Sequence, residues 1–322
     1  MKFNLFSRIV FIALLAFVVN SFVYFSFGNI YSSKILNYSG FEQQFNSGIY
    51  QYRILSGYFL IWIHDFLSHL NIDFQVFKLK FFDRNTEPKM YLSFYILNTF
   101  FLVLSSVMMM LITESKRFIA TQSEKILLSA AAVFTVAFSQ FVIVPYDISS
   151  YFFILVFFFF LIKYLEKNST QNLTVLAIIM LVSTINRESS ALSLALAATF
   201  LHAKFGLKKE TFLPVAVLAI SFIAVYFGMR LMNESFSTND GNLLTENFLQ
   251  PKNILGLLFW ALFFVFSLLL AKDKKAVNSI LVFHFLAAPY ILMCFYTGII
   301  YEIRLYVPIF IISLAISRTE LT

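Results

Sequence analysis

The sequence predicts an all-α, polytopic helical membrane protein, and three observations support that fold class. First, 60% of the 322 residues are hydrophobic and 43 of them are phenylalanine. Second, only 13% of the residues are charged, whereas a soluble domain carries roughly 25%, and the mean hydropathy is +0.80. Third, several apolar runs reach or approach the roughly 20 residues that a helix needs to cross about 30 Å of hydrocarbon.

About ten transmembrane helices are expected, in one integral membrane domain that covers residues 1–322. Some of the apolar runs are shorter than a full span, which is tolerated where helix ends are buried in protein or line a wet cavity. The expected spans are Ile9–Gly28, Tyr91–Ile112, Ile126–Val144, Ile148–Tyr164, Leu173–Asn186, Ser189–Ala203, Thr211–Arg230, Ile254–Ala271, Val277–Ile300 and Leu305–Ser317.

Basic clusters between the spans set the expected orientation. They lie in short connections, as at Lys116–Arg117, Lys204–Lys209 and Lys272–Lys275, and such clusters mark cytoplasmic loops. Both termini are then cytoplasmic, and we expect a multi-pass protein of the inner (plasma) membrane in contact with membrane lipids. The formal charge of +7 does not indicate nucleic-acid binding, because no basic stripe is longer than a loop.

The same orientation places residues 29–89 wholly outside, as one long outer loop with interfacial helices. The first span then ends outside, and the span Tyr91–Ile112 must end at the cytoplasmic Lys116–Arg117 cluster. Within it, Ile54–Leu70 is apolar but interrupted by His64, Asp65 and His69. A segment of this kind can lie along the membrane surface. Counting it as a span would invert every later loop and move the basic clusters outside.

No cofactor is indicated, although a divalent metal stays possible. The chain has no phosphate-binding glycine loop and no DxD motif, and its single cysteine, Cys294, can form no intrachain disulfide. His64 and His69 are weak metal-ligand candidates. We expect His284, in the middle of a span, to be a packed core histidine.

Four polar constellations stand out, and the expected topology places all of them at the outer face. They are Glu42–Arg53, Pro145–Asp147, Asn186–Glu188 and Tyr301–Arg304. Ionisable residues at membrane depth cost roughly 2.5 to 3.5 kcal/mol each even on lenient scales, and they usually mark function.

Each constellation also has a purely structural interpretation. Asp147 is a suitable helix N-cap, Arg187 and Glu188 could form an ion pair in a turn, and Arg304 could extend to phospholipid headgroups. Glu42 could be solvated surface. A common function is favoured because four independent accidents are not expected to fall on one face.

The arrangement resembles the type C (GT-C) fold of integral membrane glycosyltransferases. The resemblance lies in a first helix, a long outer loop and many spans with short outer turns, and in four segments. Enzymes of this family transfer a sugar from a polyprenyl-phosphate donor at the outer or luminal face, and an acidic residue soon after the first helix is commonly the catalytic base. Glu42 best matches that residue here, although the family more often has Asp. The segments are FEQQFNSGIYQYRIL in the outer loop, PYD at Pro145–Asp147, NRES at Asn186–Ser189 and YEIRLYVP at Tyr301–Pro308.

The residue chemistry agrees with transfer of a sugar to a glycan or lipid acceptor. A hydroxyl acceptor needs a carboxylate to take its proton, and arginine holds an anionic phosphate bidentately. The candidate catalytic residues are Glu42 and, as the alternative base, Asp147. The candidate substrate-binding residues are Tyr52, Arg53, Arg187, Glu188, Glu302 and Arg304.

Two other functions remain open at this point. One is an O-antigen or exopolysaccharide polymerase, which also uses polyprenyl-linked sugars. The other is a flippase or transporter for lipid-linked oligosaccharide, for which we would expect inverted repeats and polar residues through the bilayer centre. The sequence shows neither feature beyond His284 and scattered Ser and Thr.

Overall fold

The computed structural model describes residues 4–26, 33–70, 72, 74, 86–233, 236 and 241–321. Over these residues the chain is helical, and the only β contact is an isolated antiparallel bridge between Phe118 and Thr319. The α-helices are α1 (Leu5–Ser26), α2 (Tyr38–Phe45), α3 (Ile54–His69), α4 (Pro88–Thr113), α5 (Gln122–Phe138), α6 (Asp147–Glu166), α7 (Thr170–Asn186), α8 (Ala191–Phe205), α9 (Lys209–Leu231), α10 (Leu244–Leu249), α11 (Ile254–Leu269), α12 (Lys274–Leu286), α13 (Ala288–Thr297) and α14 (Val307–Ile316). Short 3-10 turns are η1 (Ser33–Ile35), η2 (Tyr50–Tyr52), η4 (Ser139–Phe141), η5 (Glu188–Ser190), η6 (Pro251–Asn253) and η7 (Ile303–Leu305).

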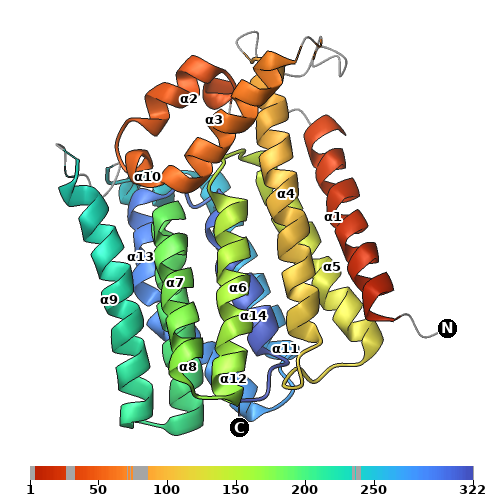
Figure 1. The fold of residues 1–322 in the computed structure, drawn as a ribbon, viewed down its shortest axis with the longest axis vertical. Coiled ribbons are helices and arrows are strands. Elements are labelled where there is room, and N and C mark those ends of the chain that lie inside the picture. The colour runs from red at the N-terminus through yellow and green to blue at the C-terminus, as the bar shows by residue number, and fades with distance from the viewer. Residues whose placement is uncertain are drawn as a thin grey trace.

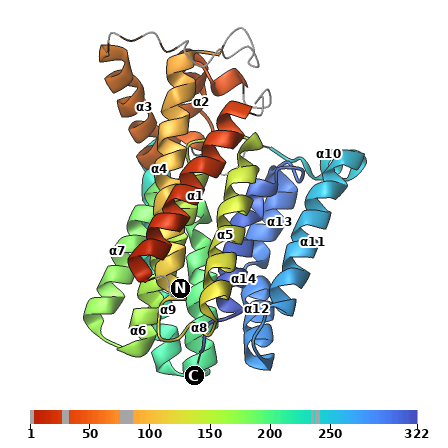
Figure 2. The same cartoon turned by 90° about the vertical axis from the view of Figure 1, so that its right-hand side faces the viewer.

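The long helices run side by side between two ends of the molecule (Figure 1; Figure 2). Helices α2 and α3 cover one end, where the short α10 also lies, and we call this the α2–α3 end. The two termini lie toward the other end, which also carries the α4–α5, α6–α7, α8–α9 and α11–α12 connections. These four connections contain the basic clusters, so the structure gathers at one end the loops that the sequence assigned to one side.

Within the described part of the chain, six helices are long and apolar enough to cross a membrane: α1, α4, α6, α9, α5 with η4, and η6 with α11. The bent pair α12 and α13 raises the number to seven, and α7 and α14 are apolar but shorter. Helices α9 and α11 expose large apolar side chains along their length, including Ile220, Phe227, Leu258 and Leu262. Exposed apolar surface of that extent belongs in lipid. The fold is therefore that of a helical membrane protein, and ten crossings stay a prediction.

Two expected spans are divided in the structure. The expected span Val277–Ile300 is bent by 47° between α12 and α13, because Pro289 stands in the first turn of α13 and cannot continue the hydrogen bonding of α12. The expected span Ile126–Val144 leaves the α-helix at Phe138, passes through η4 and becomes extended at Val142. Pro145 disfavours helical backbone in the residue before it.

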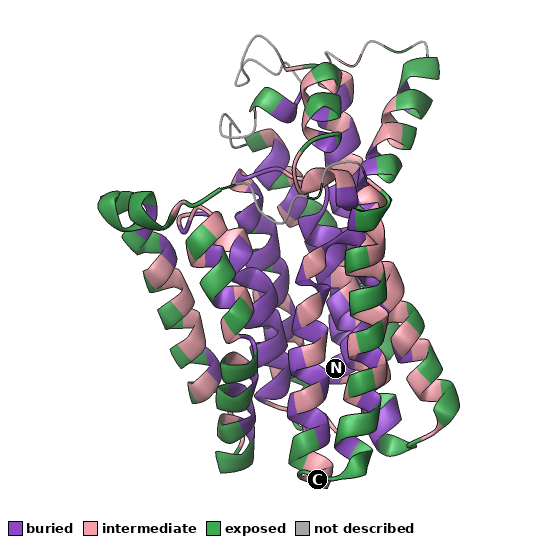
Figure 3. Ribbon diagram, turned by 90° about the vertical axis from the view of Figure 1, so that its left-hand side faces the viewer, coloured by how far each residue is buried: buried purple, intermediate pink, exposed green. Residues whose placement is uncertain are grey.

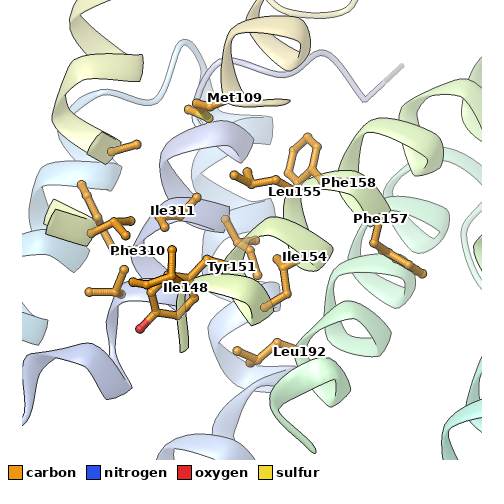
Figure 4. Close-up of a cluster of buried hydrophobic side chains, with 14 of the residues drawn as sticks. Met109, Ile148, Tyr151, Ile154, Leu155, Phe157, Phe158, Leu192, Phe310 and Ile311 are labelled. Carbon is orange, nitrogen blue, oxygen red and sulfur yellow. The ribbon is translucent and has the colours of Figure 1, made fainter. Parts of the chain in front are cut away.

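Helix α6 lies at the centre of the apolar core. Its buried side chains, among them Tyr151 and Phe158, meet Met109 of α4, Leu192 of α8 and Phe310 of α14 (Figure 4). Figure 3 shows that the buried surface concentrates on the central helices, whereas the peripheral helices are exposed on their outer faces. Inside a bilayer such packing stabilises through van der Waals contact rather than through escape from water.

The end with the termini is held by capping and by ion pairs. Thr121 and Glu124 form a capping box at the start of α5, which satisfies two free backbone N–H groups. Glu114, at the end of α4, lies 3.0 Å from Arg8 of α1 and 3.2 Å from Lys125 of α5. Lys125 is thus a buried ion-pair partner rather than a free loop charge.

At the α2–α3 end, α2 packs closely on α3. Asn37 caps α2 by accepting from Gly40 N–H at 2.7 Å. The ring of Phe45 lies where a side chain at Gly57 of α3 would be, so only glycine permits this approach. Helix α3 exposes a stripe of apolar residues that includes Tyr58, Trp62 and Phe66, as an interfacial helix requires.

The topology can be tested by labelling from outside the cell. We expect a Ser47→Cys variant to react with an impermeant thiol reagent in intact cells. A Gln122→Cys variant at the opposite end should react only after the membrane is opened. Both positions are exposed and the native Cys294 is buried, so background labelling is low. Labelling of Gln122→Cys from outside together with protection of Ser47→Cys would contradict the expected orientation.

Candidate functional site

The candidate site is a buried group of charged side chains at the α2–α3 end. Its members come from four separate turns: the η2–α3 junction, the α5–α6 connection, the α7–α8 connection and the α13–α14 connection. All are residues that the sequence selected. We call this group the ionic cluster, and it consists of Arg53, Asp147, Arg187, Glu188, Glu302 and Arg304.

Asp147 is the centre of the ionic cluster. One carboxylate oxygen pairs with Arg187, and the other accepts from Nη1 of Arg304 at 2.8 Å. Arg304 uses its Nη2 to bind Glu302. Asp147 is only 2% exposed, so its charge depends on the two guanidinium groups rather than on water.

The second part of the cluster is a bidentate pair between Arg53 and Glu188. The Nε and Nη2 atoms of Arg53 lie 3.0 and 2.5 Å from the two carboxylate oxygens of Glu188. The guanidinium also lies 5.1 Å from the ring centre of Tyr50 and 5.6 Å from that of Tyr146, within cation–π range. Three arginines and three carboxylates therefore balance one another.

Burial and neighbouring charges shift the pKa values of Arg53, Arg187 and Glu188. Burial alone would raise the pKa of Glu188, but Arg53 and then Arg187 hold it down at about 2. Burial, together with repulsion from Arg53, lowers the pKa of Arg187 to about 10, which still leaves it protonated near pH 7. Burial opposes the positive charge of Arg53, but the carboxylate of Glu188 outweighs it and raises the pKa of Arg53.

Asn186 fixes the turns around the cluster, a role that the sequence did not assign to it. Its Oδ1 accepts from Ser56 of α3 at 2.5 Å, and its Nδ2 donates to Ser149 of α6 at 2.9 Å and to the carbonyl of Tyr146 at 3.3 Å. The side chain thereby joins α3, α6 and α7. Its position directly before Arg187 was the available signal.

Asp147 is not a helix N-cap, which was its simpler interpretation. The N-cap residue of α6 is Tyr146, which makes no side-chain capping bond, and Asp147 begins the first turn. A carboxylate there interacts favourably with the positive end of the helix dipole. Its oxygens are nevertheless directed to arginines on other turns.

Tyr52 is held by a residue that the sequence did not single out. Its ring is buried, and the guanidinium carbon of Arg230 lies 4.4 Å from its centre and 3.7 Å from that of Tyr226. Arg230 lies in the last turn of α9 and is 3% exposed. At the end of an apolar span it resembled an ordinary interfacial arginine, so nothing in its sequence position distinguished it.

Glu42 is at the same end of the molecule but is not a member of the ionic cluster. Phe41 and Phe45 form the buried face of α2, which leaves Glu42 on the exposed side of the helix. Among the described residues its carboxylate has no hydrogen bond or ion pair. It is therefore an exposed carboxylate, whereas Asp147 is doubly paired.

An anion could bind here by displacing a carboxylate from an arginine. It could also accept hydrogen bonds from donors that have no partner in the described part of the chain. Nε of Arg304, the hydroxyl of Tyr146 and the hydroxyl of Ser189 are buried and have no hydrogen-bond partner in the described part of the chain. Buried donors without partners are costly, and an oxyanion would satisfy them. No group of three or more His, Cys, Asp or Glu side chains suited to a metal ion occurs among the described residues.

No protein-family model matches the chain, and comparison with curated proteins finds no significant relative.

The dependence of the fold on the ionic cluster can be tested with Asp147→Asn. This nearly isosteric change leaves two buried guanidinium groups without their shared counter-charge, and breaking a buried ion pair costs about 3–5 kcal/mol. We expect a clear fall in thermal unfolding temperature in detergent. Asp65→Asn, at an exposed carboxylate of α3, is the control and should leave that temperature unchanged. Equal unfolding temperatures for both variants and the parent would contradict this role.

Proposed function

We propose that the chain is an integral membrane glycosyltransferase. It transfers a sugar from a polyprenyl-phosphate donor to a glycan or lipid acceptor at the outer face of the inner membrane. The observation that carries the proposal is the convergence of Arg53, Arg187 and Arg304, from three separate turns, in one low-dielectric site at the α2–α3 end. The resemblance to the type C glycosyltransferase fold agrees with it.

In this proposal Arg187 and Arg304 hold the donor phosphate. Both now bind carboxylates, and a phosphate that displaces Glu302 from Arg304 would gain a forked partner and the free Nε of Arg304. Arg53, held against Glu188, contributes fixed positive charge beside the phosphate. Tyr50, which is only partly buried, offers a ring face to the sugar.

We assign the general base to Glu42 and the orientation of the arginines to Asp147. Glu42 takes the proton of the acceptor hydroxyl while its oxygen attacks the anomeric carbon. The bond from that carbon to the phosphate oxygen breaks, and polyprenyl phosphate leaves with the electron pair. Both oxygens of Asp147 are engaged by arginines, so it is a poor proton acceptor. The assignment requires the outer loop to bring Glu42 within hydrogen-bond reach of the acceptor.

The base assignment is tested by Glu42→Gln in a membrane assay with synthetic polyprenyl-phosphate sugars. Removal of a general base costs a factor of about 10² to 10⁴ in rate. Because Glu42 is exposed and has no ion pair with any described residue, protein level and unfolding temperature should not change. Glu246→Gln, at an exposed carboxylate of α10, is the control and should stay active. Full activity of Glu42→Gln would remove the base role, and extension of a lipid-linked glycan in blocks would indicate a polymerase.

The phosphate role is tested by Arg187→Lys and Arg304→Lys. Lysine keeps the charge but loses the fork, and a hydrogen bond to a charged group contributes about 1.5–3 kcal/mol. We therefore expect activity to fall by about 10- to 100-fold at normal protein levels. Arg318→Lys, which keeps its pairing with Glu124 at the other end, is the control. Full activity of both cluster variants would contradict phosphate binding.

A further inference from the structure

A groove of about 530 Å³ lies between α3 and the start of α4, at the α2–α3 end. Its size falls within the range of small-molecule sites. Helices α2, α3 and α4 surround it, and these three come together at that end (Figure 1; Figure 2). The polar residues that line it are Tyr38, His64, Ser68, Glu87 and Lys89.

The polar groups of the groove are held in place by the chain. The rings of Tyr38 and His64 stack with their centres 4.7 Å apart and their planes 27° from parallel. Glu87 accepts from the backbone N–H of Tyr38 at 3.2 Å, which ties α2 to the start of α4. Nε2 of His64 lies 4.0 Å from Glu87, too far for a hydrogen bond, so both groups keep hydrogen-bonding capacity for a ligand.

The charge of the groove distinguishes it from the ionic cluster. Glu87 and Lys89 carry opposite charges, and no arginine is among the described residues that line the groove. An anionic phosphate would gain little there, whereas hydroxyl groups can both donate to carboxylate and accept from ammonium and imidazole. The stacked rings offer an apolar face beside these groups. This combination suits a neutral polyhydroxylated ligand.

The groove and the proposed reaction site share the outer loop: Tyr38 and His64 line the groove, and Glu42 and Arg53 belong to the proposed site. Glu42 stands four residues after Tyr38 on α2, so the two side chains share a face. His64 stands 11 residues after Arg53, which is about 16 Å along the axis of α3. An extended ligand in the groove could therefore direct its end toward Glu42 and the arginines.

We propose that this groove binds the distal part of a neutral oligosaccharide acceptor. The assignment of an acceptor rests on the proposed transferase function, but saccharide binding by the groove can be measured without any reaction. It makes the acceptor an oligosaccharide rather than a single sugar or a simple lipid.

The test is the labelling rate of Ser68→Cys in the full-length protein in detergent, with a neutral maleimide. Ser68 is exposed and lines the groove, and Ser47→Cys, exposed in the same loop but outside the groove, is the matched control. The probe is a mixture of neutral oligosaccharides released by hydrolysis of the source cell's own envelope polysaccharide. We expect it to slow labelling of Ser68→Cys at least fivefold and to leave Ser47→Cys unchanged.

Loss of this protection when Tyr38→Ala is combined with Ser68→Cys would support a role of the stacked Tyr38 and His64 rings in saccharide binding. If Tyr38→Ala lowers the unfolding temperature, His64→Leu tests the same platform. Unchanged labelling of Ser68→Cys, or protection by short-chain phosphatidylglycerol but not by oligosaccharide, would overturn the proposal. Protection without sugar transfer in the membrane assay would support saccharide binding by the groove and contradict the transferase function. Sugar transfer without protection would contradict only the proposal that the groove binds the acceptor.

Discussion

The structure depends on the neutralisation of Asp147 by Arg187 and Arg304 in the interior of the α2–α3 end, where Asp147 and Arg187 are almost fully buried. In such a medium an isolated charge is very costly, so the three groups can be buried only together. Each belongs to a different turn, and their pairing therefore fixes the α5–α6, α7–α8 and α13–α14 connections relative to one another. Asn186 extends this fixed region to α3 through Ser56.

The same arrangement explains how one group of residues can serve both stability and binding. Without a ligand each arginine is satisfied by a carboxylate, so no positive charge is left buried and unpaired. A phosphate brings its own negative charge and can take the place of a carboxylate at little electrostatic cost. Glu188, with 30% of its side chain accessible, is the carboxylate that water can best solvate once it is displaced. Glu302, bound to Arg304, is the one that a phosphate at Arg304 would replace. Asp147, bound on both sides, is the one that stays.

The sequence predicted much of this site because charges are so rare in it. With most of the chain apolar, the four polar turns stood out. Assigning the basic loops to the cytoplasmic side placed these turns together at the opposite end. What it could not predict depends on three-dimensional packing. The exposure of Glu42 follows from the burial of Phe41 and Phe45, the role of Arg230 from the approach of α9 to Tyr52, and the bend at Pro289 from a break inside an otherwise continuous apolar run. The burial of Phe41 and Phe45 and the approach of α9 are decided by neighbours distant in sequence, whereas the bend is caused locally by Pro289.

Phosphate binding by the ionic cluster is tested most directly by an experimental structure of the full-length protein with a bound, non-reactive polyprenyl-phosphate analogue. We expect the phosphate to lie within hydrogen-bond distance of Arg187 and Arg304, Glu302 to have moved away from Arg304, and Asp147 to keep its contact with Arg187. A phosphate bound elsewhere, with all the ion pairs of the cluster unchanged, would show that the cluster only holds the fold together.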